Sequence, residues 1–410
     1  MGKRKWYFLT VLPICSLTAS AYEIGVIDPD LKDPDRFDTE FGFERNHERM
    51  TALALECLYA ANRDSKKIVH EPVRCENYSP DSSTYALFSA SSSQLLEPAR
   101  VDHAINNYLD LIKHVRFPDD PTRMLKYKGT IPKFVELVKV DCKIRKLSGP
   151  IDATTDGMLC ASHYGSWQFM HAMANDDGIK ASDTRKLINQ WLSFTYKIAS
   201  EDTEIDITEG YCDYWDKKEH TYPDLAAVMY NQGYRDKKWC ESRCGSFLRC
   251  LNPFLDDLPP WTVGTTFNLY CKNPIDSGIC NTYKHGPTTD SQIRKAALGS
   301  MLHLIQDSFS NAHTERIVND RKPTVDCKPI VRYRSYTHQS SSNHGTTDKW
   351  PTFSPECENS DIYDPILASA KVIYHVHKKT KSDLFPFDLN KIFGKNPTPE
   401  NKSEAGKAFE

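Results

Sequence analysis

Two histidines and an aspartate share one apolar stretch of the chain, "HLIQDSFSNAH", residues 303–313. In an α-helix His303 and Asp307 would project from the same face one turn apart, so that an imidazole and a carboxylate could grip one cation. His313 would lie about 15 Å further along a continuous helix, too far to reach the same ion. Either His313 plays no part, or the chain turns after the helix and the site holds several ions.

The same spacing recurs in "SYTHQSSSNHGTTDKW", where His344 and Asp348 are again four residues apart. Together the two blocks resemble the signature of the zinc-dependent phospholipase C family, whose superfamily includes the fungal-type zinc nucleases of single-stranded nucleic acid. The resemblance implies an all-helical domain with about three zinc ions. It assigns His303 and Asp307 to the first ion, Asp307 also to a second, and the third to His313, His344 and Asp348.

The resemblance also implies ligands that precede this signature. "RNHERMTALAL" provides His47 and "SHYGSWQFMHAM" provides His163. "FPDDPTR" provides Asp119, slightly preferred, or Asp120 as the carboxylate that completes the coordination and orients the attacking water; Asp152 and Asp156 are rivals. Two further histidines, His171 and His338, are interpreted as packing or supporting side chains.

The chain departs from the family near its start. Family members use the amino-terminal residue beside the early histidine, whereas Tyr22, the expected first mature residue, lies 25 residues before His47. A water, Glu40 or Glu44 could take that place. The implied activity is hydrolysis of the glycerol-side phosphodiester of phospholipids such as phosphatidylcholine. The alternatives are a zinc nuclease or nucleotidase, and a secreted binding protein with structural metals.

The start of the chain has the charge order of a secretory signal peptide over residues 1–21, with Lys3, Arg4 and Lys5 before a short apolar run. No stretch is long and apolar enough for a transmembrane helix. We therefore expect a secreted protein, extracellular or periplasmic, that meets phospholipid headgroups at membrane surfaces. The net charge is -3 and no basic run occurs, which argues against a duplex nucleic acid partner.

Cysteine usage agrees with export, because removing residues 1–21 leaves twelve of the 13 cysteines, an even number. Six of the twelve fall within 201–290, which predicts a disulfide-rich insertion. The pairing and the oligomeric state cannot be read from the residues.

Apolar residues recur at helical spacing in most of the chain, so the expected class is all-α. Helices are predicted within 46–62, 101–115, 133–147, 166–174, 184–200, 292–313 and 364–379, and "KPIVRYRSY" is the best strand candidate. The predicted hydrolase domain spans 22–200 and 291–392. Residues 393–410 are polar and predict a disordered tail.

Overall fold

The computed structural model describes residues 46–65, 67–75, 111, 114–115, 117–119, 140, 142–144, 147, 151, 158–217, 221–229, 262–268, 289–316, 328–340, 344, 362–381, 388–395 and 401–406. Within them the fold is mainly helical. The α-helices are α2 (Asn46–Ala61), α8 (Met158–Tyr164), α9 (Ala181–Ala199), α10 (Tyr211–Trp215), α11 (Pro223–Met229), α14 (Asp290–Asp307), α16 (Pro365–Lys378) and α17 (Asn390–Phe393). The 3-10 helices are η2 (Phe117–Asp119), η3 (Gln168–His171) and η6 (Val263–Asn268), and the strands are β1 (Thr314–Arg316) and β2 (Ile330–Tyr333).

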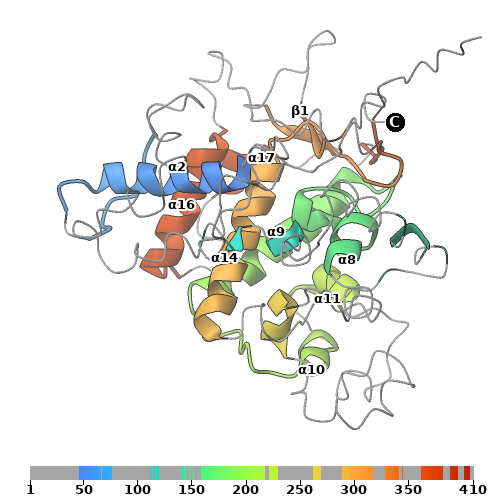
Figure 1. Cartoon of the computed structure of the whole chain (residues 1–410), viewed down its shortest axis with the longest axis horizontal. Coiled ribbons are helices and arrows are strands. Elements are labelled where there is room, and N and C mark those ends of the chain that lie inside the picture. The colour runs from blue at the N-terminus through green and yellow to red at the C-terminus, as the bar shows by residue number, and fades with distance from the viewer. Residues whose placement is uncertain are drawn as a thin grey trace, which may run out of the picture.

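Helix α14 is the centre of the fold, with α2 and α16 on one side of it and α8 and α11 on the other (Figure 1). It packs against α9, α16 and α2, and its residues 296–307 are all buried. A capping box starts the helix, since Thr289 and Gln292 exchange side chain to backbone hydrogen bonds of 3.3 Å. Burial on all sides and a defined start fix the direction in which its last residues point.

Close packing fixes α14 along its length as well. A Cβ atom on Gly299 would lie 2.1 Å from the carbonyl oxygen of His114. The segment at 114–115 therefore touches the helix backbone directly, and only glycine permits this approach.

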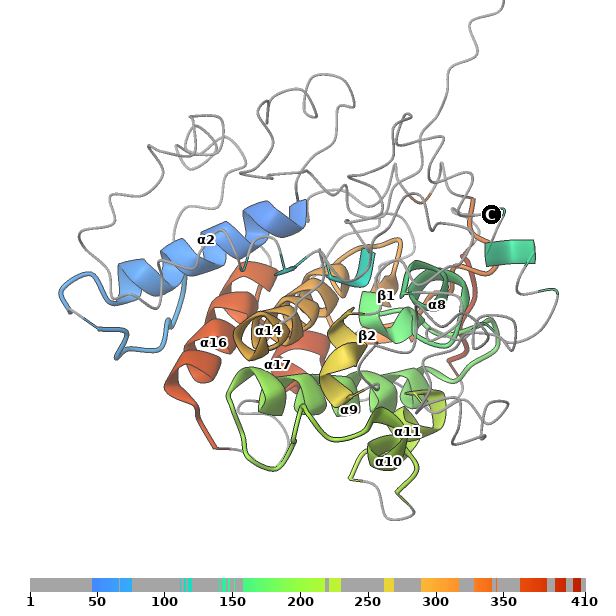
Figure 2. The same ribbon diagram turned by 60° about the horizontal axis from the view of Figure 1, so that its bottom comes forward.

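Helix α16 lies beside α2 and α14, as Figure 2 shows from a second side. Asp364 caps its start by accepting from the backbone N–H groups of Ile366 and Leu367, and Pro365 opens its first turn. Lys379, with φ of 49°, ends it in the left-handed conformation.

Parts of the predicted cysteine-rich insertion join the central core. Trp215, Tyr222 and Phe267 are buried, and all three rings lie within 5.0–6.5 Å of the Phe194 ring on α9. Cys212 is disulfide-bonded; the other five cysteines of this stretch lie outside the described residues. Apolar packing thus holds 201–217, 221–229 and 262–268 in place, whereas the cysteine count predicts stabilisation mainly by disulfides.

Two disulfides connect described residues, Cys57 with Cys75 and Cys142 with Cys160. The strand prediction is confirmed, since β2 pairs antiparallel with β1. In the part of the chain described here, no helix is both long and apolar enough to cross a bilayer. Residues 1–21 lie outside it.

The predicted disordered tail is wrong for 401–406. This segment runs beside 178–181, where Gly178 donates to the Ser403 carbonyl (2.9 Å) and Ser403 donates to the Ile179 carbonyl (2.8 Å). Ser403 and Ala405 are buried. Backbone pairing and small side chains hold the segment in place, and neither feature appears in a count of polar residues.

Candidate metal centre

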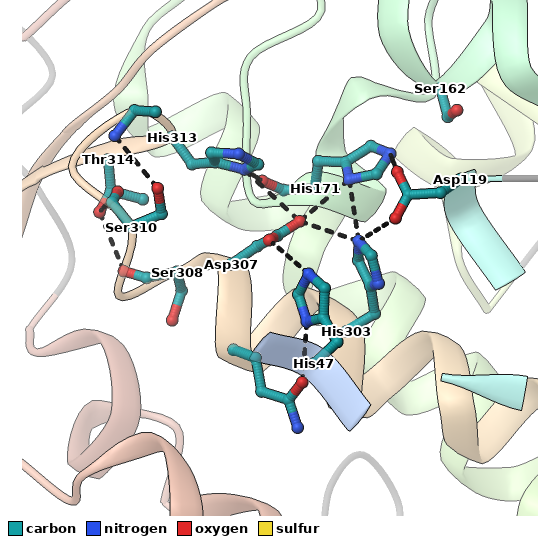
Figure 3. A network of polar contacts seen from close by, with 12 residues as sticks. His47, Asp119, Ser162, His171, His303, Asp307, Ser308, Ser310, His313 and Thr314 are labelled. Carbon is teal, nitrogen blue, oxygen red and sulfur yellow. Dashed lines mark hydrogen bonds and ion pairs between the residues drawn. The ribbon is translucent and has the colours of Figure 1, made fainter. Parts of the chain in front are cut away.

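The carboxyl-terminal turns of α14 carry the first two site residues. His303 and Asp307 are each 1% exposed and point from the same face, with His303 Nε2 3.1 Å from Asp307 Oδ2 (Figure 3). The predicted i, i+4 pair is therefore present and buried. A buried carboxylate is costly unless charges or hydrogen bonds surround it.

The helix ends at Asp307, and the chain then turns back. Ser308 caps the helix, and Ser310 donates from its backbone to the Asp307 carbonyl (2.9 Å). His313 thereby returns toward the same carboxylate, with its Nδ1 3.4 Å from Asp307 Oδ2. Of the two alternatives left open for His313, the structure therefore has the one in which the chain turns before this residue.

Helix α2 supplies His47, which is 1% exposed. Its Nε2 lies 3.2 Å from Asp307 Oδ1, and its ring stacks on that of His303 with centroids 3.8 Å apart. One oxygen of Asp307 thus faces His47, while the other faces histidines from three different places in the chain.

A second buried carboxylate, Asp119 on η2, lies next to the first group. His163 and His171 place their Nε2 atoms 3.5 and 3.6 Å from Asp119 Oδ1, and His303 Nε2 lies 3.5 Å from Asp119 Oδ2. His303 therefore lies between the two aspartates. Asp120, the other predicted carboxylate, is outside the described residues, as are Asp152 and Asp156.

His171, which the sequence indicates as a packing or supporting side chain, lies at the centre of the candidate site and belongs to two of its donor groups. It is fully buried, and its Nδ1 lies 2.9 Å from Asp307 Oδ2. Helical spacing predicts one helix over 166–174, but α8 ends at Tyr164 and His171 lies at the end of the short 3-10 helix η3. Gly165, packed against Ala161, marks the break between them.

The second predicted pair is described only in part. His344 is buried, and its ring centroid lies 5.0 Å from that of His313. Tyr336 lies close to both, with centroids 4.9 Å from His344 and 5.9 Å from His313. Asp348 is outside the described residues. His338, the other supporting candidate, is exposed and pairs with Asp177.

Backbone carbonyls fix the protonated nitrogen of two histidines. His303 Nδ1 lies 2.8 Å from the Val115 carbonyl, and His313 Nδ1 lies 2.6 Å from the His171 carbonyl. Because a carbonyl only accepts, Nδ1 carries the proton in each case. In its neutral form each ring then presents a lone pair at Nε2, the form that binds metals.

Side chains fix three more histidines in the same way. The Gln339 amide donates to the carbonyls of Ala312 and Ala405, so its oxygen accepts from His344 Nδ1 (2.5 Å). His47 Nδ1 donates to Gln306 Oε1 (2.8 Å).

His163 belongs to this group too. Ser162 donates its hydroxyl proton to the Pro118 carbonyl, and its oxygen therefore accepts from His163 Nδ1 (2.9 Å). In its neutral form each of the five rings would present Nε2, as metal-binding histidines held by a hydrogen bond at the other nitrogen do.

Burial and charge act against each other on the titrating groups. Burial alone would raise the pKa of Asp307, but the surrounding histidines, His313 foremost, hold it well below its usual range. Burial would lower the pKa of His47, yet the Asp307 carboxylate raises it from 6.5 to about 9. Burial dominates at His171, whose pKa falls to about 3. A cation would take the place of the proton on His47.

Three groups of donor atoms lie within reach of a shared ion: His47, His303 and Asp307; Asp119, His163 and His171; and His171, Asp307 and His313. Asp119 Oδ2 and His171 Nε2 are buried and make no hydrogen bond to any described residue. Buried polar atoms normally have such partners. These residues therefore fit divalent cations, and their mixture of imidazole and carboxylate matches the ligands of zinc.

Comparisons of the chain with family models, with curated proteins and with solved structures find no match to any of them.

Proposed function

We propose that this protein is a zinc-dependent phosphodiester hydrolase of the phospholipase C type. The observation that carries the proposal is the convergence of imidazoles, five of them fixed to present Nε2, around two shared buried carboxylates. A merely structural zinc site needs four ligands around one ion. Adjacent donor groups that share Asp307 and His171 suit several ions, as in enzymes that cleave phosphate esters.

The residues divide among the proposed ions as follows. His47, His303 and Asp307 would hold one, Asp119 with His171 or His163 another, and Asp307 with His313 and His344 a third, to which Asp348 would add a carboxylate. Zinc bound there would supply activation of water at neutral pH and neutralisation of the phosphate charge.

The exposed fractions of the site's side chains indicate the side from which a substrate would approach. His163 has 15% of its side chain exposed, whereas the side chains of Asp119, His171, His303, Asp307 and His313 are at most 4% exposed. Substrate would thus arrive over His163. Tyr336, partly exposed with its ring centroid 5.1 Å from that of His163, would border this opening.

Asp119 would act at this opening in its ionised form. Burial would raise its pKa, but His303, His171 and His163 hold it below its usual value, so it stays ionised at neutral pH. It can then bind a cation or accept a hydrogen bond from an attacking water. An ionised Asp119 is unsuited to the role of general acid.

Phospholipid is preferred over nucleic acid as the substrate because the blocks around His163 and His303 resemble the lipases of the superfamily more than the nucleases. The disulfides at Cys57–Cys75 and Cys142–Cys160 support secretion, since such bonds persist in oxidising compartments. A signal peptide at 1–21 belongs to the same proposal. An aromatic ring beside the site, Tyr336, would suit a quaternary ammonium headgroup or a stacked base equally.

The test compares substrates with purified, zinc-loaded protein. We expect release of a phosphorylated headgroup from phosphatidylcholine vesicles, and loss of this activity on chelation with recovery on zinc addition. Cleavage of single-stranded DNA alone would select the nuclease. Zinc-loaded protein that is inactive on both substrates would leave the metals as structural and refute the proposal.

A further inference from the structure

A cavity of about 540 Å³ lies at the opposite end of α14 from the metal centre. Asp290, at its edge, is the first residue of α14 and Asp307 the last, roughly 25 Å apart at the rise of an α-helix. The cavity therefore shares no residue with the candidate metal centre. Its volume is within the range of ligand pockets.

The floor of the cavity is aliphatic. Leu55 and Leu58 of α2, Leu298 of α14 and Ile373 and Val376 of α16 all line it, so the three packed helices meet there. None of the described lining residues is Phe, Tyr or Trp. Branched aliphatic walls suit a flexible alkyl chain, because a planar ring would lack aromatic faces to pack on.

The rim of the cavity carries an excess of positive charge. Its charged lining residues are three cations, Arg294, Lys295 and Lys379, and two carboxylates, Glu201 and Asp290. Lys379 pairs with Glu201 at 2.7 Å. Asp290 lies in the first turn of α14, where the helix itself favours a carboxylate.

Arg294 is held in position at this rim, since its Nη1 donates to the Ile198 carbonyl (2.8 Å). A fixed guanidinium with further N–H groups is suited to an anionic head group. The apolar floor and the cationic rim together suit a ligand that has both an alkyl chain and an anionic head group.

We propose that this cavity binds a single-chain anionic amphiphile, with its alkyl chain between α2, α14 and α16 and its carboxylate or phosphate beside Arg294 and Lys295. The proposal is independent of phosphodiester hydrolysis. Fatty acids and single-chain phospholipids share this chemistry, and their head groups distinguish them.

The experiment is calorimetric titration of the full-length, zinc-loaded protein with dodecanoate and with dodecyl phosphate, below their micellar concentrations. We expect one site per chain for at least one of these anions, and at least about tenfold weaker binding of dodecanol, which lacks the charge. The preferred anion identifies the head group. No binding of either anion, or equal binding of dodecanol, overturns the proposal.

Variants locate the site. Val376→Trp, at a partly exposed position, should fill the cavity and weaken binding of the anions at least tenfold, and Lys295→Glu should weaken it by about tenfold. Lys402→Glu, a charge reversal on the exposed part of the 401–406 segment, should change nothing. Asp307→Asn should bind as the wild type does. Binding that survives Val376→Trp, or that is lost in Asp307→Asn, would place the ligand elsewhere and refute the assignment.

Discussion

Replacing Asp307 by Asn tests the metal centre at its most connected residue. Asp307 belongs to two of the three donor groups, and its two oxygens lie 2.9–3.4 Å from nitrogens of His47, His171, His303 and His313. Asparagine keeps the size of the side chain and removes the charge together with one acceptor oxygen. Packing should therefore change little while the electrostatics change strongly.

The size of the effect follows from His47. Burial lowers its pKa, but the neighbouring carboxylates, Asp307 first, raise it from 6.5 to about 9, a net stabilisation of the charged ring of roughly 3 kcal/mol. Because the folded pKa is the higher one, this stabilisation is complete below pH 6.5 and disappears as the pH rises through 9. Metal-free Asp307→Asn should thus be less stable than wild type by up to about 3 kcal/mol near pH 6, and the difference should shrink toward pH 9.

Zinc adds a second readout. Since the group formed by Asp119, His163 and His171 does not include Asp307, the variant should lose up to two of three ions and keep that one. Hydrolysis should fall by at least about a hundredfold, the upper end of what losing a mere supporting residue costs.

Urea unfolding of chelated protein at the two pH values, with zinc analysis of the loaded protein, measures both effects. Asp183→Asn, an exposed acid on α9 paired with Lys186, is the matched control and should behave as wild type. If Asp307→Asn matched the wild type in acid stability, in zinc content and in activity, the reasoning about this carboxylate would be wrong.

Three further predictions follow from single contacts. Gln339→Leu removes the acceptor that orients His344 and should weaken binding of the zinc assigned to His313 and His344 by about 10- to 100-fold in a chelator competition; unchanged affinity would contradict the orienting role. Zinc binding at neutral pH should release the proton held by His47, visible as a buffer-dependent heat that vanishes above about pH 9, and a heat independent of buffer would argue against a charged His47. Gly299→Ala should destabilise the fold by about 1–3 kcal/mol or more in urea, because its Cβ meets the His114 carbonyl, and a neutral effect would mean that this segment can move away.

Helical spacing predicted part of the geometry of the candidate site. The proximity of His303 and Asp307 follows from a four-residue interval in an apolar run, and the reach to His313 left a turn after the helix as one of two alternatives. His47 lies on the predicted early helix and contacts Asp307. These positions could be predicted because they depend on helix periodicity, which the pattern of apolar residues indicates.

His171 could not be placed in this way because the seven residues between it and His163 do not form one helix. Gly165 directly follows Tyr164, and a glycine at this place is typical of a helix end. Beyond it, the eight-position interval from His163 to His171 no longer shows which residues share a helix face. What brings His171 to Asp307 is the packing of η3 against α14, a contact between segments far apart in the sequence. The same holds for Asp119, whose neighbours come from three other elements.

Among the described contacts, the segment at 401–406 is connected to the candidate metal centre through the side-chain amide of Gln339. Gln339 donates to the Ala405 carbonyl with the same nitrogen that contacts Ala312, and its oxygen holds His344. A protease that trims this segment, or a tag that displaces it, would therefore loosen a candidate ligand without touching any histidine or aspartate. The zinc content of the purified protein would then show whether the 401–406 segment is intact and in place.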